Sequence, residues 1–177
     1  MTQQQNLAFV FPGQGSQSTG MLDDLAQTYP EVKQTFERAS DALQKDLWAL
    51  VSESALEAEL NQTHNTQPVM LAAGIAVWAI WSKNSAIRPA WLAGHSLGEY
   101  SALVCAGALD FEEAIKLVAL RGTLMQEAVP QGVGAMAAIL GLDESVVIEV
   151  CAKAAENEVV SAVNFNSQGQ VVIAGHV

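Results

Sequence analysis

Residues 88–105, RPAWLAGHSLGEYSALVC, hold the feature that most restricts how this chain can fold. A short apolar segment leads into the Gly-x-Ser-x-Gly pattern of residues 94–98, and a helix-like segment follows. This order of strand, turn and helix is the one that a nucleophile elbow requires. Glycines on both sides of Ser96 allow a sharp backbone turn and the close approach of a substrate. The stretch therefore favours an α/β fold with Ser96 at the tip of a strand-to-helix turn.

The chemistry of Ser96 has two interpretations at this stage. The same pentapeptide occurs in ordinary turns, where the serine has only a structural role. If Ser96 is a nucleophile, the free N–H groups at the helix N-terminus favour a developing oxyanion, and the N–H of Leu97 is the natural first donor. His95 is a poor general base, because adjacent side chains on a tight turn point apart.

The remainder of residues 1–130 predicts further alternation of strands and helices. Residues 6–12 (NLAFVFP) indicate a buried strand, and residues 31–60 indicate helices with polar faces. A turn is expected at 64–68 and a buried helix at 69–81, with Pro68 suited to its first turn. Asp110 and Glu113 resemble a capping box that opens a helix over 111–128.

The pattern changes after residue 130. We expect a strand over 134–142, a helix over 143–157, and two strands over 159–166 and 170–177. This β-α-β-β order is the first part of a ferredoxin-like sandwich, which needs one more helix and strand. The sequence therefore predicts two parts, residues 1–130 and residues 131–177.

Composition excludes several classes of function. Half of the 177 residues are hydrophobic, which is enough for a sizeable core. Eight Lys and Arg against 19 Asp and Glu give a net charge of −11, which argues against a general nucleic-acid role. Cys105 and Cys151 show neither metal-ligand spacing nor a disulfide framework. The longest apolar stretch, residues 69–81, is too short to cross a bilayer, and MTQQQN is no signal peptide, so we expect a soluble, cytoplasmic protein.

FPGQGSQ, residues 11–17, is the second candidate site. It is not a Walker A loop, because no Gly-Lys-Ser/Thr follows, and it lacks the third glycine of a dinucleotide fingerprint. Gln14, with a glycine on each side, can present its backbone N–H to a ligand at the end of a strand. A plain surface loop is the alternative.

Arg121 is the third candidate. Counting about 100° per residue along 111–128 places it at the edge of the apolar face. A guanidinium in that position either extends to water or binds an anion, and a carboxylate held in bidentate fashion is the best geometric match. The residues predicted to form the apolar face itself are Phe111, Ile115, Val118 and Met125.

Together these motifs resemble malonyl-CoA:acyl carrier protein transacylases, the acyltransferases of bacterial fatty-acid synthesis. The resemblance lies in FPGQGSQ, TQP (66–68), GHSLGEYSAL (94–103), LRG (120–122), GAMAAILG (134–141) and NFNSQGQVVIAG (164–175). It covers essentially the whole chain, but only the N-terminal part of the family's usual length. Gln168 stands where related sequences commonly have Pro, a difference that should leave the chemistry intact.

The resemblance implies an α/β-hydrolase-like core with a parallel sheet and an inserted ferredoxin-like α+β subdomain, incomplete here. It implies that Ser96 is the acylated nucleophile and that the backbone N–H groups of Gln14 and Leu97 form the oxyanion hole. The substrate-binding residues that it implies are Arg121 for the malonyl carboxylate, and Gln67 and Asn166 for the acyl pocket.

The resemblance also implies the reaction: a malonyl group moves from malonyl-CoA to the thiol of acyl carrier protein, without a cofactor or metal. We expect no nucleic-acid or membrane partner, and a monomer. The family's general-base histidine would fall after Val177, so the isolated chain is expected to be inactive. Two alternatives stay open: a serine hydrolase that uses the same elbow, and a non-catalytic carrier-binding module if the chain ends at Val177.

Overall fold

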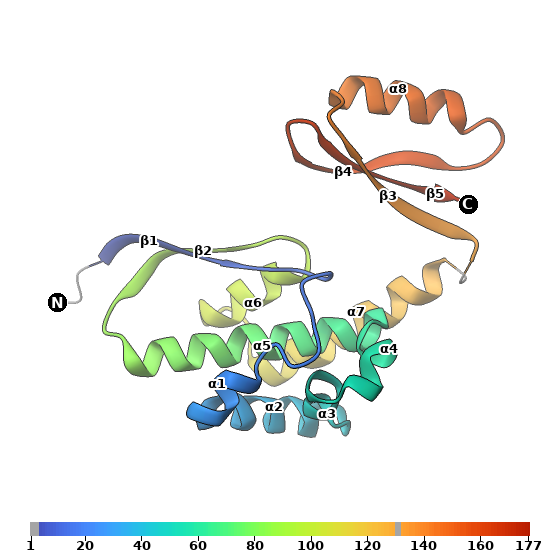
Figure 1. Cartoon of the computed structure of the whole chain (residues 1–177). Coiled ribbons are helices and arrows are strands. Elements are labelled where there is room, and N and C mark those ends of the chain that lie inside the picture. Colours follow the sequence, from blue (N-terminus) through green and yellow to red (C-terminus); the bar gives the residue numbers. More distant parts are fainter. Residues whose placement is uncertain (1–3, 130–131) are drawn as a thin grey trace. The chain divides into compact units, whose positions relative to one another are not determined.

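The computed structural model describes residues 4–129 and 132–177 (Figure 1). The chain forms two compact units, of which the first ends at Met125 and the second spans Gln126–Val177. The division falls ahead of the change expected at 130/131. Each unit has its own core and is described by itself below.

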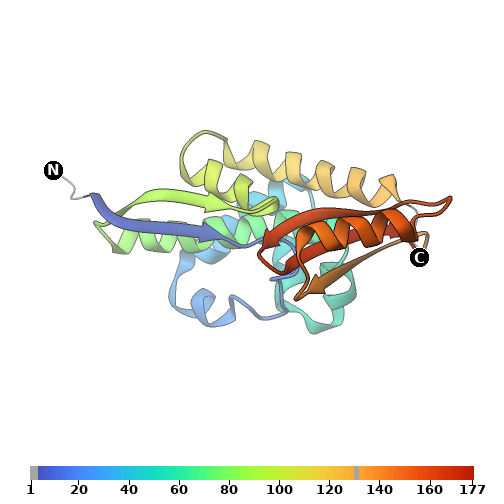
Figure 2. The same cartoon turned by 90° about the horizontal axis from the view of Figure 1, so that it is seen from above.

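The first unit contains a parallel pair of strands, β1 (Gln4–Phe11) and β2 (Arg88–Gly94), as the sequence predicts. The two strands run side by side in Figure 2. Their register places Phe11 opposite Gly94, so both strands end at the same edge. FPGQGSQ and GHSLG, which follow these two strands, therefore emerge next to each other.

Helices make up most of the rest of this unit. A parallel strand pair needs a long crossover, and here every secondary-structure element of the crossover between β1 and β2 is a helix. The predicted capping interaction is present before α7, where the N–H of Glu113 donates to Oδ1 of Asp110 at 3.0 Å. The helices are α1 (Asp23–Thr28), α2 (Pro30–Leu43), α3 (Leu47–Ser52), the 3-10 turn η1 (Ser54–Leu56), α4 (Glu57–Leu60), α5 (Thr63–Asn84), α6 (Leu97–Cys105) and α7 (Phe111–Ala128), which continues past Met125.

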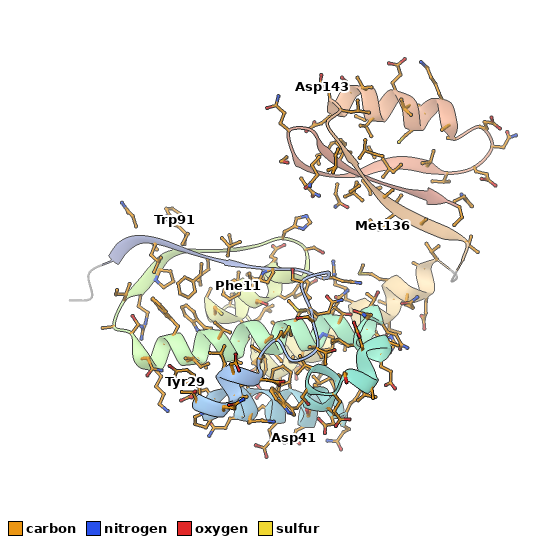
Figure 3. All side chains as sticks on the ribbon, viewed as in Figure 1. Phe11, Tyr29, Asp41, Trp91, Met136 and Asp143 are labelled. Carbon is orange, nitrogen blue, oxygen red and sulfur yellow. The ribbon has the colours of Figure 1, made fainter. Side chains whose placement is uncertain are left out.

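One face of the strand pair packs on helices and the other is exposed. The ring of Phe9 lies edge-on against Trp78 and Trp81 of α5, with centroids 5.5 and 5.1 Å apart. Trp91 points away from α5 in Figure 3 and is 70% exposed. Val10 follows Phe9 in β1, and because successive strand side chains alternate between faces, Val10 is also exposed.

The turn predicted at 64–68 is wrong, because α5 already begins at Thr63. A residue before proline is normally biased away from helix, which favoured the turn. Buried side-chain bonds override that bias: Nδ2 of Asn65 donates to the carbonyl of Glu59 at 2.8 Å, and Oγ1 of Thr66 donates to the carbonyl of Leu60 at 2.5 Å. Gln67 consequently projects from a helix.

The second unit is an antiparallel sheet with one helix on it. Its elements are β3 (Gly134–Leu140), α8 (Glu144–Ala154), β4 (Val160–Ser167) and β5 (Gln170–His176), in the strand order β3-β5-β4. The predicted β-α-β-β order is confirmed. Val147 and Cys151 of α8 pack on Val171, whereas Met136 lies on the opposite face of the sheet and is 65% exposed (Figure 3).

Candidate active site

Ser96 occupies the tip of a sharp turn between β2 and α6. Its φ of 54° and ψ of −111° lie in a region that residues with a Cβ rarely adopt. The turn is closed by a hydrogen bond from the N–H of Gly98 to the carbonyl of His95 at 3.0 Å. Leu97 is buried and fixes the first turn of α6 in the core, while Ser96 is exposed. The strand–turn–helix order predicted from the sequence is confirmed.

The two glycines of the pentapeptide are required by close backbone contacts. A Cβ on Gly98 would lie 2.1 Å from the carbonyl oxygen of Phe11. A Cβ on Gly94 would lie 2.0 Å from the carbonyl carbon of Gly98. These positions allow the end of β1, the end of β2 and the start of α6 to touch, which brings FPGQGSQ to the serine.

The FPGQGSQ loop lies against the elbow and is tied to the helices beyond it. A Cβ on Gly13 would lie 3.2 Å from the carbonyl oxygen of His95. The side-chain amide of Gln14 donates to Oγ1 of Thr63 at 3.2 Å, and that of Gln17 donates to Oδ1 of Asn61 at 2.8 Å. The loop is thus held in a defined place beside Ser96, which its interpretation as a plain surface loop does not require.

Arg121 of α7 points at the serine. Its Nη2 donates to Oγ of Ser96 at 2.9 Å, and its Nη1 donates to Oε1 of Gln67 at 2.8 Å. The guanidinium carbon lies 5.7 Å from the ring centroid of Tyr100 in α6. No ion pair of the described residues includes Arg121, so its partners there are neutral oxygens and a ring. The guanidinium lies where an anion attached to Ser96 could reach it.

Gln67 is the buried partner of this arginine. Its side chain is fully buried in the first turns of α5, and its Nε2 donates to Sδ of Met125 at 3.2 Å. The sequence predicted both Gln67 and Arg121 as substrate-binding residues, and the structure brings them together with Ser96. It does not test those roles.

Gly122 allows α7 to lie this close to α5. A Cβ at this position would be 2.6 Å from Cα of His64 and 2.8 Å from the carbonyl oxygen of Thr63. Sequence reasoning missed Gly122 and Met125 as parts of the site. The available signal was their position relative to Arg121. Gly122 is the next residue, and Met125 follows one helical turn later, where side chains share a face.

The structure does not test the roles of three other predicted residues. Asn166 is exposed on β4 of the second unit, and its role stays a prediction, as do the oxyanion-hole roles of Gln14 and Leu97. Within residues 4–129 and 132–177, no hydrogen bond links a histidine to Ser96. His176 instead accepts a bond at Nδ1 from the N–H of Val159, at 3.0 Å.

Metal sites, membrane spans and a second nucleophile are three further possibilities for the described part of the chain. No three metal-ligating side chains gather within it. None of its helices has both the length and the apolar character of a membrane span. Burial raises the pKa of the Cys105 thiol to about 12, which makes this cysteine a poor nucleophile at neutral pH.

Comparison with known proteins identifies a matching family model and close relatives. Residues 8–177 match the family model described as acyl transferase domain. Malonyl CoA-acyl carrier protein transacylase of Escherichia coli K12 is 60% identical over 169 residues, which are 96% of this chain and 54% of that protein. The chain thus spans about half the length of the curated relatives that it matches.

Solved structures give the same picture. The acyl carrier protein S-malonyltransferase of Vibrio cholerae is 62% identical, with a TM-score of 0.90, over 97% of this chain and 56% of that one. A malonyl-transacylase solved in complex with a type II PKS acyl-carrier protein is 58% identical, with a TM-score of 0.93, over 97% and 55%. These matches show a mixed α/β fold that contains a parallel sheet.

Proposed function

The chain belongs to the acyl transferase domain family, and from that membership we propose that its protein moves a malonyl group from malonyl-CoA to the phosphopantetheine thiol of acyl carrier protein. One observation carries the choice of acyl group. The Arg121 guanidinium is one hydrogen bond from Oγ of Ser96, so a carboxylate on an acyl-serine would meet a fixed cation.

The family also suggests a finer description of the fold. We propose that the first unit is the N-terminal part of an α/β-hydrolase-like core and that the second is the first part of a ferredoxin-like subdomain. The parallel β1–β2 pair with its elbow supports the first assignment, and the β-α-β-β order supports the second.

In the first half-reaction, Oγ of Ser96 attacks the thioester carbonyl carbon of malonyl-CoA, and a general base takes the hydroxyl proton. The tetrahedral oxyanion is stabilised by the backbone N–H groups of Gln14 and Leu97. The carbon–sulfur bond then breaks, CoA leaves with a proton returned from the base, and a malonyl-serine ester remains. The base is a histidine elsewhere in the protein, as the family resemblance implies.

In the second half-reaction, the carrier thiol loses its proton to the same base, and its sulfur attacks the ester carbonyl. The bond to Oγ of Ser96 breaks, and the serine recovers its proton. Arg121 holds the malonyl carboxylate through both steps. It therefore selects for a substrate whose far end is an anion, because a neutral acetyl group would leave a half-buried guanidinium without a charged partner.

Intact mass spectrometry tests the proposal. The protein at its natural length is incubated with malonyl-CoA and should gain one malonyl group, which hydroxylamine or the carrier thiol removes. Ser96→Ala should abolish the adduct. Ser145→Ala, in an exposed serine of the second unit, is the matched control and should leave it unchanged. An adduct that persists in Ser96→Ala contradicts the assignment of the nucleophile.

Assays of hydrolysis and of carrier binding distinguish the two alternatives. A serine hydrolase would release free malonate or hydrolyse simple neutral esters without a carrier thiol. A carrier-binding module would retain affinity for acyl carrier protein and form no acyl-serine. The Arg121–Ser96 contact favours transfer of a carboxylated acyl group over hydrolysis of neutral esters.

We further propose a cytoplasmic location, a monomeric state and no cofactor. Cys105 and Cys151 are both free thiols, which suits a reducing compartment. Asn166 is proposed to be a substrate-binding residue. Analytical ultracentrifugation tests the oligomeric state, and Asn166→Ala should raise the KM for malonyl-CoA if this residue contacts the acyl group.

A further inference from the structure

We propose that Met125 is a positioning residue: it fixes the orientation of the Gln67 amide and, through that amide, the Arg121 guanidinium. The inference rests on the proposed function, in which Arg121 binds the malonyl carboxylate. It assigns Met125 no contact with the substrate. Its effect is to determine where the cation is held before the substrate arrives.

The geometry is a bridge across one turn of α7. Arg121 and Met125 lie one helical turn apart and share a face. Gln67 reaches both from α5: its Oε1 accepts from Nη1 of Arg121 at 2.8 Å, and its Nε2 donates to Sδ of Met125 at 3.2 Å. A single buried amide therefore contacts both side chains.

The two partners of the amide have opposite hydrogen-bonding abilities. A guanidinium only donates and a thioether sulfur only accepts, whereas an amide has one end of each kind. Only one of the two flipped orientations of Gln67 satisfies both neighbours. The other would place the NH2 group against the guanidinium and the carbonyl oxygen against the sulfur.

Burial makes this orientation consequential. Gln67 is fully buried, so water is not at hand to pair with an amide that turns the wrong way. The N–H to sulfur bond is weak by itself, but it favours one orientation of the Gln67 amide. In the flipped orientation Arg121 would lose its acceptor. With Nη1 held by Gln67, Nη2 stays directed at Ser96 and at any group attached to it.

Packing alone does not explain the place of Met125. On the sequence-predicted apolar face of α7, Phe111, Ile115 and Val118 are at most 5% exposed. Met125, predicted to share that face, is 48% exposed. A side chain this open contributes little to a hydrophobic core. Among the described residues, its specific interaction is the hydrogen bond that it accepts from Gln67.

Two substitutions separate the sulfur's hydrogen bond from its bulk. Met125→Leu keeps the volume and removes the acceptor, and Met125→Gln supplies an amide oxygen that can accept. We expect Met125→Leu to raise the KM for malonyl-CoA roughly three- to tenfold with little change in kcat, which is the loss of one modest hydrogen bond. Met125→Gln should restore most of the KM. The control is Leu124→Met in the exposed neighbour, expected to change neither constant.

A double-mutant cycle tests whether Met125 acts through Gln67. In a Gln67→Ala background, Met125→Leu should cause no further rise in KM, because the bridging amide is gone. Additive effects of the two substitutions overturn the proposal. So does a KM that is unchanged in Met125→Leu but raised in Met125→Gln, because Met125 would then act only through its shape. Circular dichroism confirms that each variant is folded.

Two readouts keep this inference separate from the proposed function. If the unsubstituted protein forms no malonyl-serine, the function fails, whatever Met125 does. The orientation itself is read by NMR from the side-chain N–H2 signals of Gln67, without substrate. Met125→Leu should shift them and hasten their exchange with solvent, whereas unchanged signals overturn the inference even if malonyl transfer is established.

Discussion

Nη2 of Arg121 donates a hydrogen bond to Oγ of Ser96 over 2.9 Å, although the two residues are 25 positions apart in the chain. They come from different elements: Ser96 lies in the turn before α6, and Arg121 lies in α7. A cation next to a serine on a strained turn suits an acyl-serine that carries its own negative charge.

Arg121→Ala should lower kcat/KM for malonyl-CoA by about 100-fold, the loss of two hydrogen bonds to a charged group. The kcat/KM for acetyl-CoA should change little or not at all, because its acetyl group has no carboxylate for the arginine to bind. Initial rates with both substrates measure the ratio. Arg38→Ala is the matched control, because Arg38 pairs with Glu112 on the surface. An unchanged malonyl-to-acetyl preference in Arg121→Ala refutes the carboxylate clamp.

Gly98→Ala should destabilise the first unit by about 3 kcal/mol or more, because the new methyl would overlap the backbone of Phe11. Gly107→Ala is the control. Gly107 has a φ of 73° and open space around it, so alanine there incurs only the backbone penalty of about 1–2 kcal/mol. Urea unfolding followed by tryptophan fluorescence reports on this unit. Equal losses from the two substitutions would contradict the steric argument.

Gly122→Ala should impair substrate binding by moving α7 away from the start of α5. The added Cβ would meet backbone atoms of His64 and Thr63, which cannot rotate aside. We expect Arg121 to lose its hold on Gln67 and the KM for malonyl-CoA to rise about tenfold, the loss of about one charge-assisted bond. Steady-state kinetics measure this rise, and Ala119→Gly, on the same helix, should leave KM nearly unchanged. A normal KM in Gly122→Ala shows that the two helices can separate without moving the arginine.

Lys83→Met should reduce the acid sensitivity of the first unit. The ammonium of Lys83 bonds the carboxylate of Glu31, whose side chain is 11% exposed, and this bond lowers the pKa of Glu31 below its ordinary 4.5. A lowered folded-state pKa adds stability above pH 4.5 that is lost as the pH falls through the folded value.

The free energy of unfolding of the unsubstituted protein should therefore drop more between neutral pH and about pH 3 than that of Lys83→Met. Urea titrations at the two pH values measure both drops. Lys153→Met, which removes an exposed pair with Glu149 on α8, is the control. Identical acid sensitivity in Lys83→Met and the unsubstituted protein would show that the pair does not couple to folding.

Cys105 should resist alkylation in the native protein. Burial raises the pKa of its thiol to about 12, so at pH 8 only about one molecule in ten thousand carries the reactive thiolate. Iodoacetamide labelling followed by peptide mass spectrometry should modify Cys105 quickly in urea and very slowly without it. Rapid native labelling would indicate that the end of α6 opens readily.

Much of the local structure follows from the sequence, because it depends on neighbouring residues. The strand, glycine-flanked turn and helix around Ser96 occur where the pattern predicts them, as does the Asp110 cap of α7. These features arise from backbone freedom at glycine and from a side chain that reaches an N–H three residues away. The β-α-β-β order after residue 130 was equally readable, from strand and helix periods.

The arrangement of the site was decided by tertiary structure. Helical periodicity did not decide whether Arg121 extends to water or binds an anion. The turn-like residues 64–68 placed Gln67 in a turn, which is in fact the start of α5. Hydrogen bonds of the buried side chains of Asn65 and Thr66 stabilise this first part of α5, and Gly122 lets α7 approach it. Local preference carries no information on contacts between residues 54 positions apart, such as Arg121 and Gln67. The sequence alone therefore singled out Ser96, Gln67 and Arg121, and long-range packing determined that they meet.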